Sequence, residues 1–352
     1  LRATYSGATG FLTSPSRSVA LTVRGAASEL KVTQSPARVN RGDLLRVSVE
    51  ATAPGVANLI GTITALRGTT RLATATLDNG KATIAIPTGE LPLGPQRLRL
   101  TLESTVLPAA ETEAAFFVSG LLNVVNAASY GAVIASGSIA VLQAPGLTVP
   151  STVAGALPWP TELSGVSVAI RDARGNTLPG RIYFAGNNQV NFLVPAGLFS
   201  GEGEARLSFT GVTDVITTPI RLADTQPGIF TANGDGRGVP AAIAARVNVD
   251  GTVEPVAVFS CSSLSGCIPA AIDVTAAEPV YLSLYGTGWR GSQDVSVTVG
   301  GDTVKPDFAG AHPEIPGLDQ LNLRLPVSVR GSATLVVTAG GVASNPVQLL
   351  FR

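Results

Sequence analysis

Residues 187–197 read NNQVNFLVPAG, and residues 319–328 read DQLNLRLPVS. Both segments carry Gln-x-Asn, alternate polar with apolar residues and reach a proline where the alternation ends. Such alternation is typical of a β-strand that buries one face. A strand that is written twice, far apart in one chain, indicates that a whole domain is repeated.

Further segments repeat in the same order on both sides of this strand. The matching pairs are SGSIAVLQAPG (136–146) with AEPVYLSLYGTG (277–288), GVSVAIRD (165–172) with DVSVTVGG (294–301), IYFAG (182–186) with PDFAG (306–310), and EARLSFTGVTDVITTPIRL (204–222) with SATLVVTAGGVASNPVQLL (332–350). We therefore predict two copies of one β-sandwich, at residues 120–224 and 225–352.

The rest of the chain alternates in the same way. Across all 352 residues, 39 Gly and 24 Pro separate short segments that are expected to be strands. This pattern predicts an all-β fold of antiparallel β-sandwiches. Residues 26–119 resemble a bacterial Ig-like repeat, with a hairpin expected at LATATLDNGKATIAI (72–86), and residues 1–25 resemble the last strands of an incomplete one. We expect tandem Ig-like sandwiches in a rod-like array, with a chain that starts inside a domain.

The composition argues against two classes of function, nucleic-acid binding and membrane spanning. The 352 residues are 45% hydrophobic and only 14% charged, and the net charge is zero. A neutral chain without runs of Lys or Arg offers no electrostatic footprint for nucleic acid. No apolar window is long enough for a membrane span.

The two cysteines, Cys261 and Cys267, flank a short loop in CSSLSGC. We predict a disulfide, which indicates an oxidising, extracytoplasmic compartment. The alternative is a pair of free surface thiols in a cytosolic protein.

Residues 122–352 resemble the uncharacterised C-terminal domain family that ends many secreted proteins of acidobacteria. The matching phrases are NAASYG (126–131), SGSIAVL, QVNFLVP, PGIFTANGDGRG (227–238), the turn at 248–251 and GGVASNPVQL (340–349). The resemblance implies a secreted, multi-domain bacterial surface protein and carries over no catalytic residues. CSSLSGC departs from the family pattern.

Two sets of residues are candidates for ligand binding. Asn233, Asp235, Asn248 and Asp250 could present oxygen ligands to Ca²⁺, although Asx-Gly pairs are also the ordinary residues of tight turns. Trp159, in the Pro-flanked segment ALPWPTEL, could stack on a sugar with help from Tyr130, Tyr183 or Tyr285. Trp is equally common as a core residue, so an exposed Trp159 would favour the glycan platform and a buried one would count against it.

The repeated amides Gln189, Asn191, Gln320 and Asn322 either cap an interface between neighbouring sandwiches, or lie on an outward strand face, or tie down a neighbouring loop by hydrogen bonds to its backbone. Enzymatic chemistry has little support. GTGWRG (286–291) fits G-x-G-x-x-G but precedes a strand instead of a helix. The sole histidine, His312, lies in a loop and has no nucleophile elbow to serve.

We therefore expect a non-enzymatic extracellular protein, a stalk or fibre-forming surface subunit that associates with itself or with neighbouring domains. We expect no cofactor, and Ca²⁺ is the one candidate that the sequence raises. The alternative is a carbohydrate-binding accessory module of a secreted enzyme, whose partner would be a surface glycan.

Overall fold

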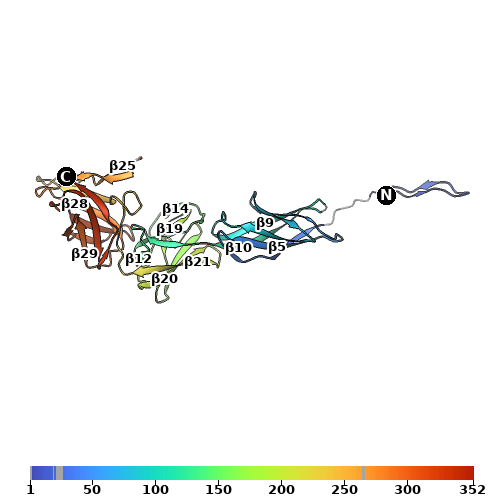
Figure 1. Ribbon diagram of the computed structural model, residues 1–352, viewed down its shortest axis with the longest axis horizontal. Helices are drawn as coiled ribbons and strands as arrows, with labels where there is room; N and C mark the ends of the chain where they lie inside the picture. Colours follow the sequence, from blue (N-terminus) through green and yellow to red (C-terminus); the bar gives the residue numbers. More distant parts are fainter. Residues whose placement is uncertain (1, 19, 21–26, 106, 264–265) are drawn as a thin grey trace. The chain divides into compact units, whose positions relative to one another are not determined.

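The computed structural model describes residues 2–18, 20, 27–105, 107–263 and 266–352, and it is built from strands joined by turns (Figure 1). None of the described segments forms an apolar helix of membrane-spanning length. The chain divides into two compact units, one of residues 1–89 and 96–116 and one of residues 90–95 and 117–352.

The first unit contains one sandwich. Its larger sheet has the order β4-β10-β9-β6-β7, and its smaller sheet the order β3-β5-β8. The strands are β3 (Glu29–Gln34), β4 (Arg38–Asn40), β5 (Leu44–Thr52), β6 (Gly61–Arg67), β7 (Thr70–Leu77), β8 (Lys81–Pro87), β9 (Gly94–Glu103) and β10 (Ala110–Ser119). Alternating residues of β5 and β8 are buried, as the pattern of the sequence predicts.

The hairpin predicted at residues 72–86 is wrong. β7 pairs with β6, whereas β8 pairs with β5 in the other sheet. Asp78 and Lys81 form a single bridge, and the chain then crosses between the sheets. A turn sequence specifies the reversal of the chain but not whether the strands on either side share a sheet.

Residues 1–25 were expected to supply two strands of an incomplete repeat. β1 (Thr4–Tyr5) and β2 (Ser14–Pro15) pair with each other in a small sheet. The second strand expected in this segment falls mostly on residues 19 and 21–25, outside the described residues.

The second unit contains two sandwiches. The sheets of the first C-terminal sandwich have the orders β11-β13-β19-β18-β14 and β12-β21-β20-β16-β15, with β17 beside β16. Its strands are β11 (Asn123–Asn126), β12 (Val133–Ala135), β13 (Ile139–Gln143), β14 (Thr152–Val153), β15 (Glu162–Leu163), β16 (Val166–Arg171), β17 (Thr177–Pro179), β18 (Arg181–Gly186), β19 (Gln189–Leu193), β20 (Gly201–Phe209) and β21 (Val215–Ala223).

The sheets of the second C-terminal sandwich have the orders β24-β23-β28-β32-β31, with β22 beside β28, and β27-β35-β33-β29-β30, with β34 beside β33. Its strands are β22 (Gly228–Ile229), β23 (Ala242–Val247), β24 (Val253–Val256), β27 (Ala271–Ile272), β28 (Val280–Thr287), β29 (Val295–Val299), β30 (Asp302–Val304), β31 (Phe308–Ala311), β32 (Asp319–Arg324), β33 (Gly331–Ala339), β34 (Val342–Ala343) and β35 (Val347–Phe351). A separate hairpin joins β25 (Phe259–Ser262) and β26 (Gly266–Pro269).

The two sandwiches repeat each other in pairing as well as in sequence. The run β13-β19-β18 corresponds to β28-β32-β31, and β16-β20-β21 corresponds to β29-β33-β35. Each also has one parallel pair, β12 with β21 and β27 with β35, which the antiparallel prediction missed. In each sandwich, a short strand (β12 or β27) joins the second sheet and pairs in parallel with the last strand of the sandwich (β21 or β35). The limits 120–224 and 225–352 themselves remain a prediction.

The core of the second C-terminal sandwich joins its two sheets. Leu282 and Leu321 from one sheet and Val297 and Leu335 from the other are all fully buried in one cluster. Such contacts between inner faces define a sandwich. The chain is therefore an all-β protein of tandem Ig-like sandwiches.

Candidate functional site

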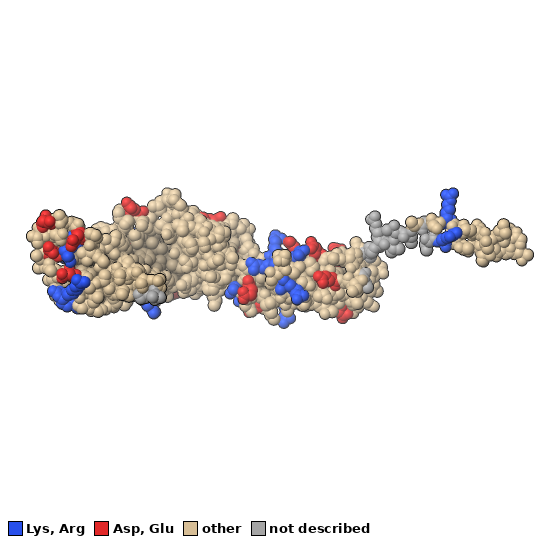
Figure 2. Space-filling model, turned by 90° about the horizontal axis from the view of Figure 1, so that it is seen from above, with Lys and Arg blue, Asp and Glu red and all other residues tan. Residues whose placement is uncertain are grey.

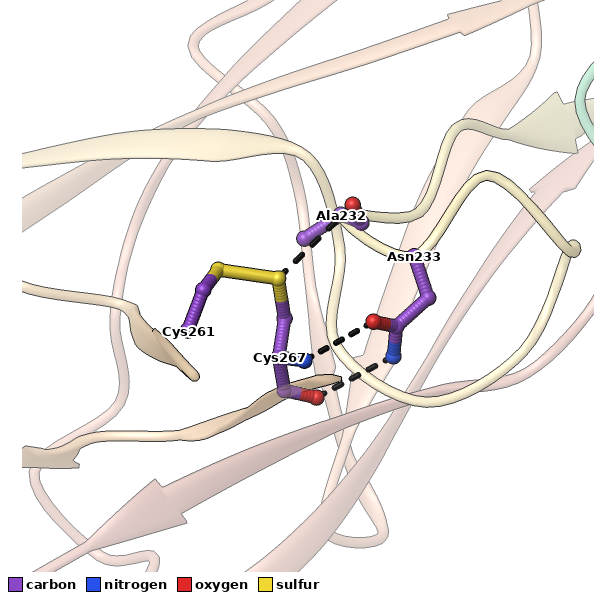
Figure 3. Close-up of a disulfide and its surroundings, with 4 residues drawn as sticks. All are labelled: Ala232, Asn233, Cys261 and Cys267. Atoms are coloured by element: carbon purple, nitrogen blue, oxygen red, sulfur yellow. Dashed lines mark hydrogen bonds between the residues drawn. A yellow bond between two sulfur atoms is a disulfide. The ribbon is translucent and has the colours of Figure 1, made fainter. Parts of the chain in front are cut away.

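The predicted disulfide is present. Cys261 and Cys267 occupy opposite positions of the β25–β26 hairpin and are bonded to each other. Figure 3 shows how Asn233 holds this hairpin: its side-chain oxygen accepts from the Cys267 N–H at 2.8 Å, and its amide nitrogen donates to the Cys267 carbonyl at 3.1 Å. The hairpin is thus tied to the loop that follows β22.

The four residues considered for calcium are used within two separate turns. Asn233 binds the cysteine hairpin, and Asp235 accepts from the Arg237 N–H at 3.0 Å. In the other turn, Asp250 accepts from both the N–H and the hydroxyl of Thr252. These bonds from Thr252 lower the pKa of Asp250. The described residues contain no cluster of three acidic, His or Cys side chains placed to hold a metal, and the calcium site stays a prediction.

Of the two outcomes that the sequence left open for Trp159, the structure shows the buried one. Only 8% of its surface is accessible, because the Pro-flanked segment packs back along β18. Arg181 donates to the Trp159 carbonyl at 2.9 Å, and the Ile182 N–H donates to the Pro160 carbonyl at 2.7 Å. By the criterion set from the sequence, this burial counts against a platform in which Trp159 projects into solvent.

Tyr130, the second residue of the predicted platform, has a different role. Its hydroxyl donates to the Gly234 carbonyl at 2.7 Å and so links the first C-terminal sandwich to a loop of the second. The ring that contacts Trp159 belongs to Tyr183, with centroids 5.2 Å apart and planes tilted by 44°.

Trp159 and Tyr183 line a cavity of about 340 Å³ between the two C-terminal sandwiches. The other lining residues are Ile139, Leu157, Phe230, Glu314, Ile315, Pro316 and Leu318. The lining is therefore mostly apolar, with one carboxylate. Ligand pockets have this character, although this one is at the small end of their range of about 300–1,000 Å³.

The repeated amides form the same contact in both sandwiches. Gln189 donates to the side-chain oxygen of Asn191 at 3.3 Å, and Gln320 donates to that of Asn322 at 2.9 Å. All four side chains are half-buried on an outward strand face, facing away from the core. This arrangement matches the simpler of the two interpretations made from the sequence, although the tie to a loop comes from the residue before each Gln.

That preceding residue was not singled out from the sequence. Asn188 accepts from the Gly146 N–H at 2.8 Å and closes the turn after β13. Asp319 occupies the matching place and accepts from the N–H groups of Trp289 and Arg290, after β28. The alignment of NNQVN with LDQLN would have identified this pair, since both positions carry an Asx residue.

Asp319 is fully buried, and its strongest partner is Arg290. The guanidinium Nε donates to the carboxylate at 2.6 Å and a second nitrogen donates to the Leu318 carbonyl at 2.6 Å. Burial raises the pKa of the Asp319 carboxyl, while the charge of Arg290 and the two backbone N–H groups oppose that rise. This ion pair lies beneath GTGWRG and explains that motif as a turn.

His312 caps its own loop. Its Nδ1 accepts from the N–H groups of Glu314 and Ile315 at 3.2 and 3.3 Å, and its ring lies 6.1 Å from that of Tyr285. These bonds use the ring nitrogen to order the loop 312–318.

No family model and no curated protein matches this sequence. Among solved structures, it is similar to a Bacteroides ovatus protein, SGBP-B of a mixed-linkage glucan utilization locus, at 13% identity, over 90% of this chain and 65% of that one, with a TM-score of 0.30. It is also similar to a tetra-tandem repeat from the extending region of a large adhesion protein (14% identity, 93% and 100% coverage, TM-score 0.28) and to the I9–I11 tandem of titin (9%, 92% and 98%, 0.20). These likenesses concern the fold alone.

Proposed function

We propose that this chain is a non-enzymatic structural protein of the bacterial cell surface, a stalk or adhesive subunit that holds successive β-sandwiches in a fixed arrangement. A stalk needs junctions that resist bending. The observation that carries the proposal is the junction between the two C-terminal sandwiches, where polar groups are buried and bonded.

Thr287 is the central residue of this junction. It is fully buried, accepts from the Ile139 N–H of the first sandwich at 2.9 Å and donates to the Gly317 carbonyl of its own sandwich at 2.6 Å. Separating the two sandwiches would break the bond from Ile139 to Thr287, which is worth about 0.5–1.5 kcal/mol once water replaces the lost partner. The bond from Thr287 to Gly317 lies within the second sandwich and holds the hydroxyl in place to accept from Ile139. The bonds therefore favour one fixed arrangement of the two sandwiches.

Two further bonds support the same junction. Asn126, fully buried, donates to the Gln226 carbonyl at 3.1 Å, and Tyr130 donates to Gly234. The disulfide supports export to an oxidising compartment, as does the resemblance of residues 122–352 to the acidobacterial C-terminal family. We propose neighbouring domains and further copies of the chain as its structural partners.

The test is a distance measurement across the junction. Spin labels at Thr177→Cys and Thr303→Cys, exposed positions on the two sandwiches, should give one narrow distance distribution in the full chain. Thr287→Val keeps the shape but removes both bonds, and it should broaden the distribution. A distribution that is already broad without the substitution would refute a rigid stalk.

A further inference from the structure

The outer face of the second C-terminal sandwich carries an aromatic row. The Phe230 N–H donates to the Tyr285 carbonyl at 3.1 Å, so the two residues are cross-strand neighbours. Tyr285 is paired with Gln320, and Gln320 with Gly310. A Cβ on Gly310 would lie 3.2 Å from the ring of Phe308, so that ring covers the last place of the row. The order across the sheet is aromatic, aromatic, amide, aromatic.

The amide in this row has bonding capacity left over. Gln320 uses one N–H for Asn322, and in the described part of the chain no protein group bonds the Gln320 side-chain oxygen or the Asn322 amide nitrogen. A partner therefore meets aromatic rings beside one free acceptor, the Gln320 side-chain oxygen, and free N–H donors on Gln320 and Asn322. A purely apolar partner would bury these amides unpaired, which is unfavourable.

The row leads into the cavity between the sandwiches, because Phe230 belongs to both. Within the cavity, Trp159 and Tyr183 form a tilted aromatic pair. Aromatic walls with a few polar groups suit a ring that has apolar C–H faces and a rim of hydroxyls. The cavity has room for one such ring, and the row offers positions for its neighbours along a polymer.

Charge excludes other polymers. Phe230, Tyr285, Gln320, Gly310 and Phe308 are all uncharged. On the face shown in Figure 2, charged side chains gather at one end of the second unit and leave most of the remainder without Lys, Arg, Asp or Glu. An anionic polymer would find no counter-charge in the row itself and would meet the Glu314 carboxylate in the adjoining cavity. The fitting partner is neutral and hydroxylated.

The first C-terminal sandwich provides an internal control. In its matching row, Asn123 pairs with Gln143 and Gln143 with Gln189. Asn123 donates to Gln143 at 3.0 Å, so amides stand where the second sandwich has Phe230 and Tyr285. Phe184 of the first sandwich covers Gly186 as Phe308 covers Gly310, so this one ring is common to both copies. The fold is thus built without aromatic residues at the places of Phe230 and Tyr285, and the presence of these two in the second sandwich needs another reason.

We propose that the row Phe230–Tyr285–Gln320–Phe308, together with the adjoining cavity, binds a neutral polysaccharide. The cavity holds one sugar ring, and the next sugars stack on Tyr285 and Phe308 while their hydroxyls bond Gln320 and Asn322. This binding is separate from the structural role proposed above and does not depend on it.

Affinity electrophoresis of the full chain in gels that contain a neutral polysaccharide tests the proposal, with mixed-linkage β-glucan, xyloglucan and galactomannan as probes. At least one should retard the protein. Tyr285→Gln and Phe230→Asn install the residues of the first sandwich and should each weaken retardation by about tenfold or more, since each removes an aromatic contact. Gln143→Ala, at the matching place in the first sandwich, should leave it unchanged.

Thermal melting of each variant by circular dichroism establishes that it is folded. If Tyr285→Gln unfolds, Phe230→Asn and Gln320→Ala replace it, because their side chains lie on the outer face. The proposal is overturned if no neutral polysaccharide retards the protein. It is equally overturned if folded row variants bind as tightly as the unaltered chain, or if only anionic polymers or apolar peptides bind.

Discussion

Replacing Asp319 by Ala should destabilise the second C-terminal sandwich more than most single changes. The carboxylate is fully buried and accepts from the Trp289 N–H at 2.8 Å, the Arg290 N–H at 3.1 Å and the Arg290 guanidinium at 2.6 Å. The Arg290 side chain is 27% exposed, so water can reach part of it once its partner is gone. Removing one partner of a buried pair costs about 3–5 kcal/mol, and we expect the lower half of that range.

The protein carries its own reporters for this experiment. Its two tryptophans lie one in each C-terminal sandwich, Trp159 in the first and Trp289 in the second. In a Trp159→Phe background, fluorescence during urea unfolding follows Trp289 alone. The midpoint and slope then give the free energy of unfolding of the sandwich that contains Asp319.

Asn188→Ala is the matched control, because Asn188 occupies the same place in the first sandwich. It makes one neutral hydrogen bond, to the Gly146 N–H at 2.8 Å. Losing this bond should cost about 0.5–1.5 kcal/mol. Asn188 has φ +67°, so the Ala side chain adds about 1 kcal/mol of backbone strain. The total is followed through Trp159 in a Trp289→Phe background. If Asp319→Ala cost no more than Asn188→Ala, the reasoning from burial and charge would be refuted.

Three further predictions concern other parts of the second unit. Burial acts to raise the pKa of Asp172, but hydrogen bonds from Asn176 and from three backbone N–H groups outweigh burial and lower the pKa. The stability that the Asp172 carboxylate contributes is therefore present above the pKa of an unfolded Asp, near 3.9, and is lost as the pH falls below that value. Asp172→Asn should flatten the acid limb of a pH–stability curve. Reducing the disulfide, or replacing Cys261 and Cys267 by Ser, should speed hydrogen exchange in the β25–β26 hairpin and leave the exchange of β28 and β32 unchanged. The two cysteines lie outside the core cluster, against which the hairpin packs through Phe259, and faster exchange throughout the sandwich would contradict this prediction. Gly288 has φ +90° and lies against the backbone of Gln226, whereas the nearest atom to a Cβ on Gly291 would be 3.8 Å away. Gly288→Ala should therefore lower the melting temperature strongly and Gly291→Ala hardly at all. Equal shifts in melting temperature would disprove this packing argument.

The strands and the repeat could be predicted because the pattern that specifies each of them lies in a short run of consecutive residues. Alternation in VSVAIRD and its partner specifies which side chains face inward, and β16 and β29 bury those residues. The disulfide could also be predicted, since two nearby cysteines around a glycine have few other uses.

The misplaced features depend on contacts between distant segments. The crossing of the chain between β7 and β8 depends on which sheet each strand joins, and the Asp-Asn-Gly turn is compatible with either outcome. The Pro-flanked segment left the exposure of Trp159 open, because its burial depends on Arg181, 22 residues further along the chain, and on Ile182, which hold the segment down. Sequence alone does not contain such pairings.

Duplication makes the differences between the two sandwiches more informative than their likenesses. Positions that the fold requires are filled alike: an Asx residue closes the turn at 188 and 319, and Gln bonds Asn two residues later in both sandwiches. Positions that the fold leaves free have changed, from Asn123 and Gln143 to Phe230 and Tyr285. Phe230 and Tyr285 are half-buried on the outer face of the sheet, and the first sandwich forms the same sheet with amides at these places. Their appearance in one copy only fits the proposed binding surface, and the shared fold does not explain it.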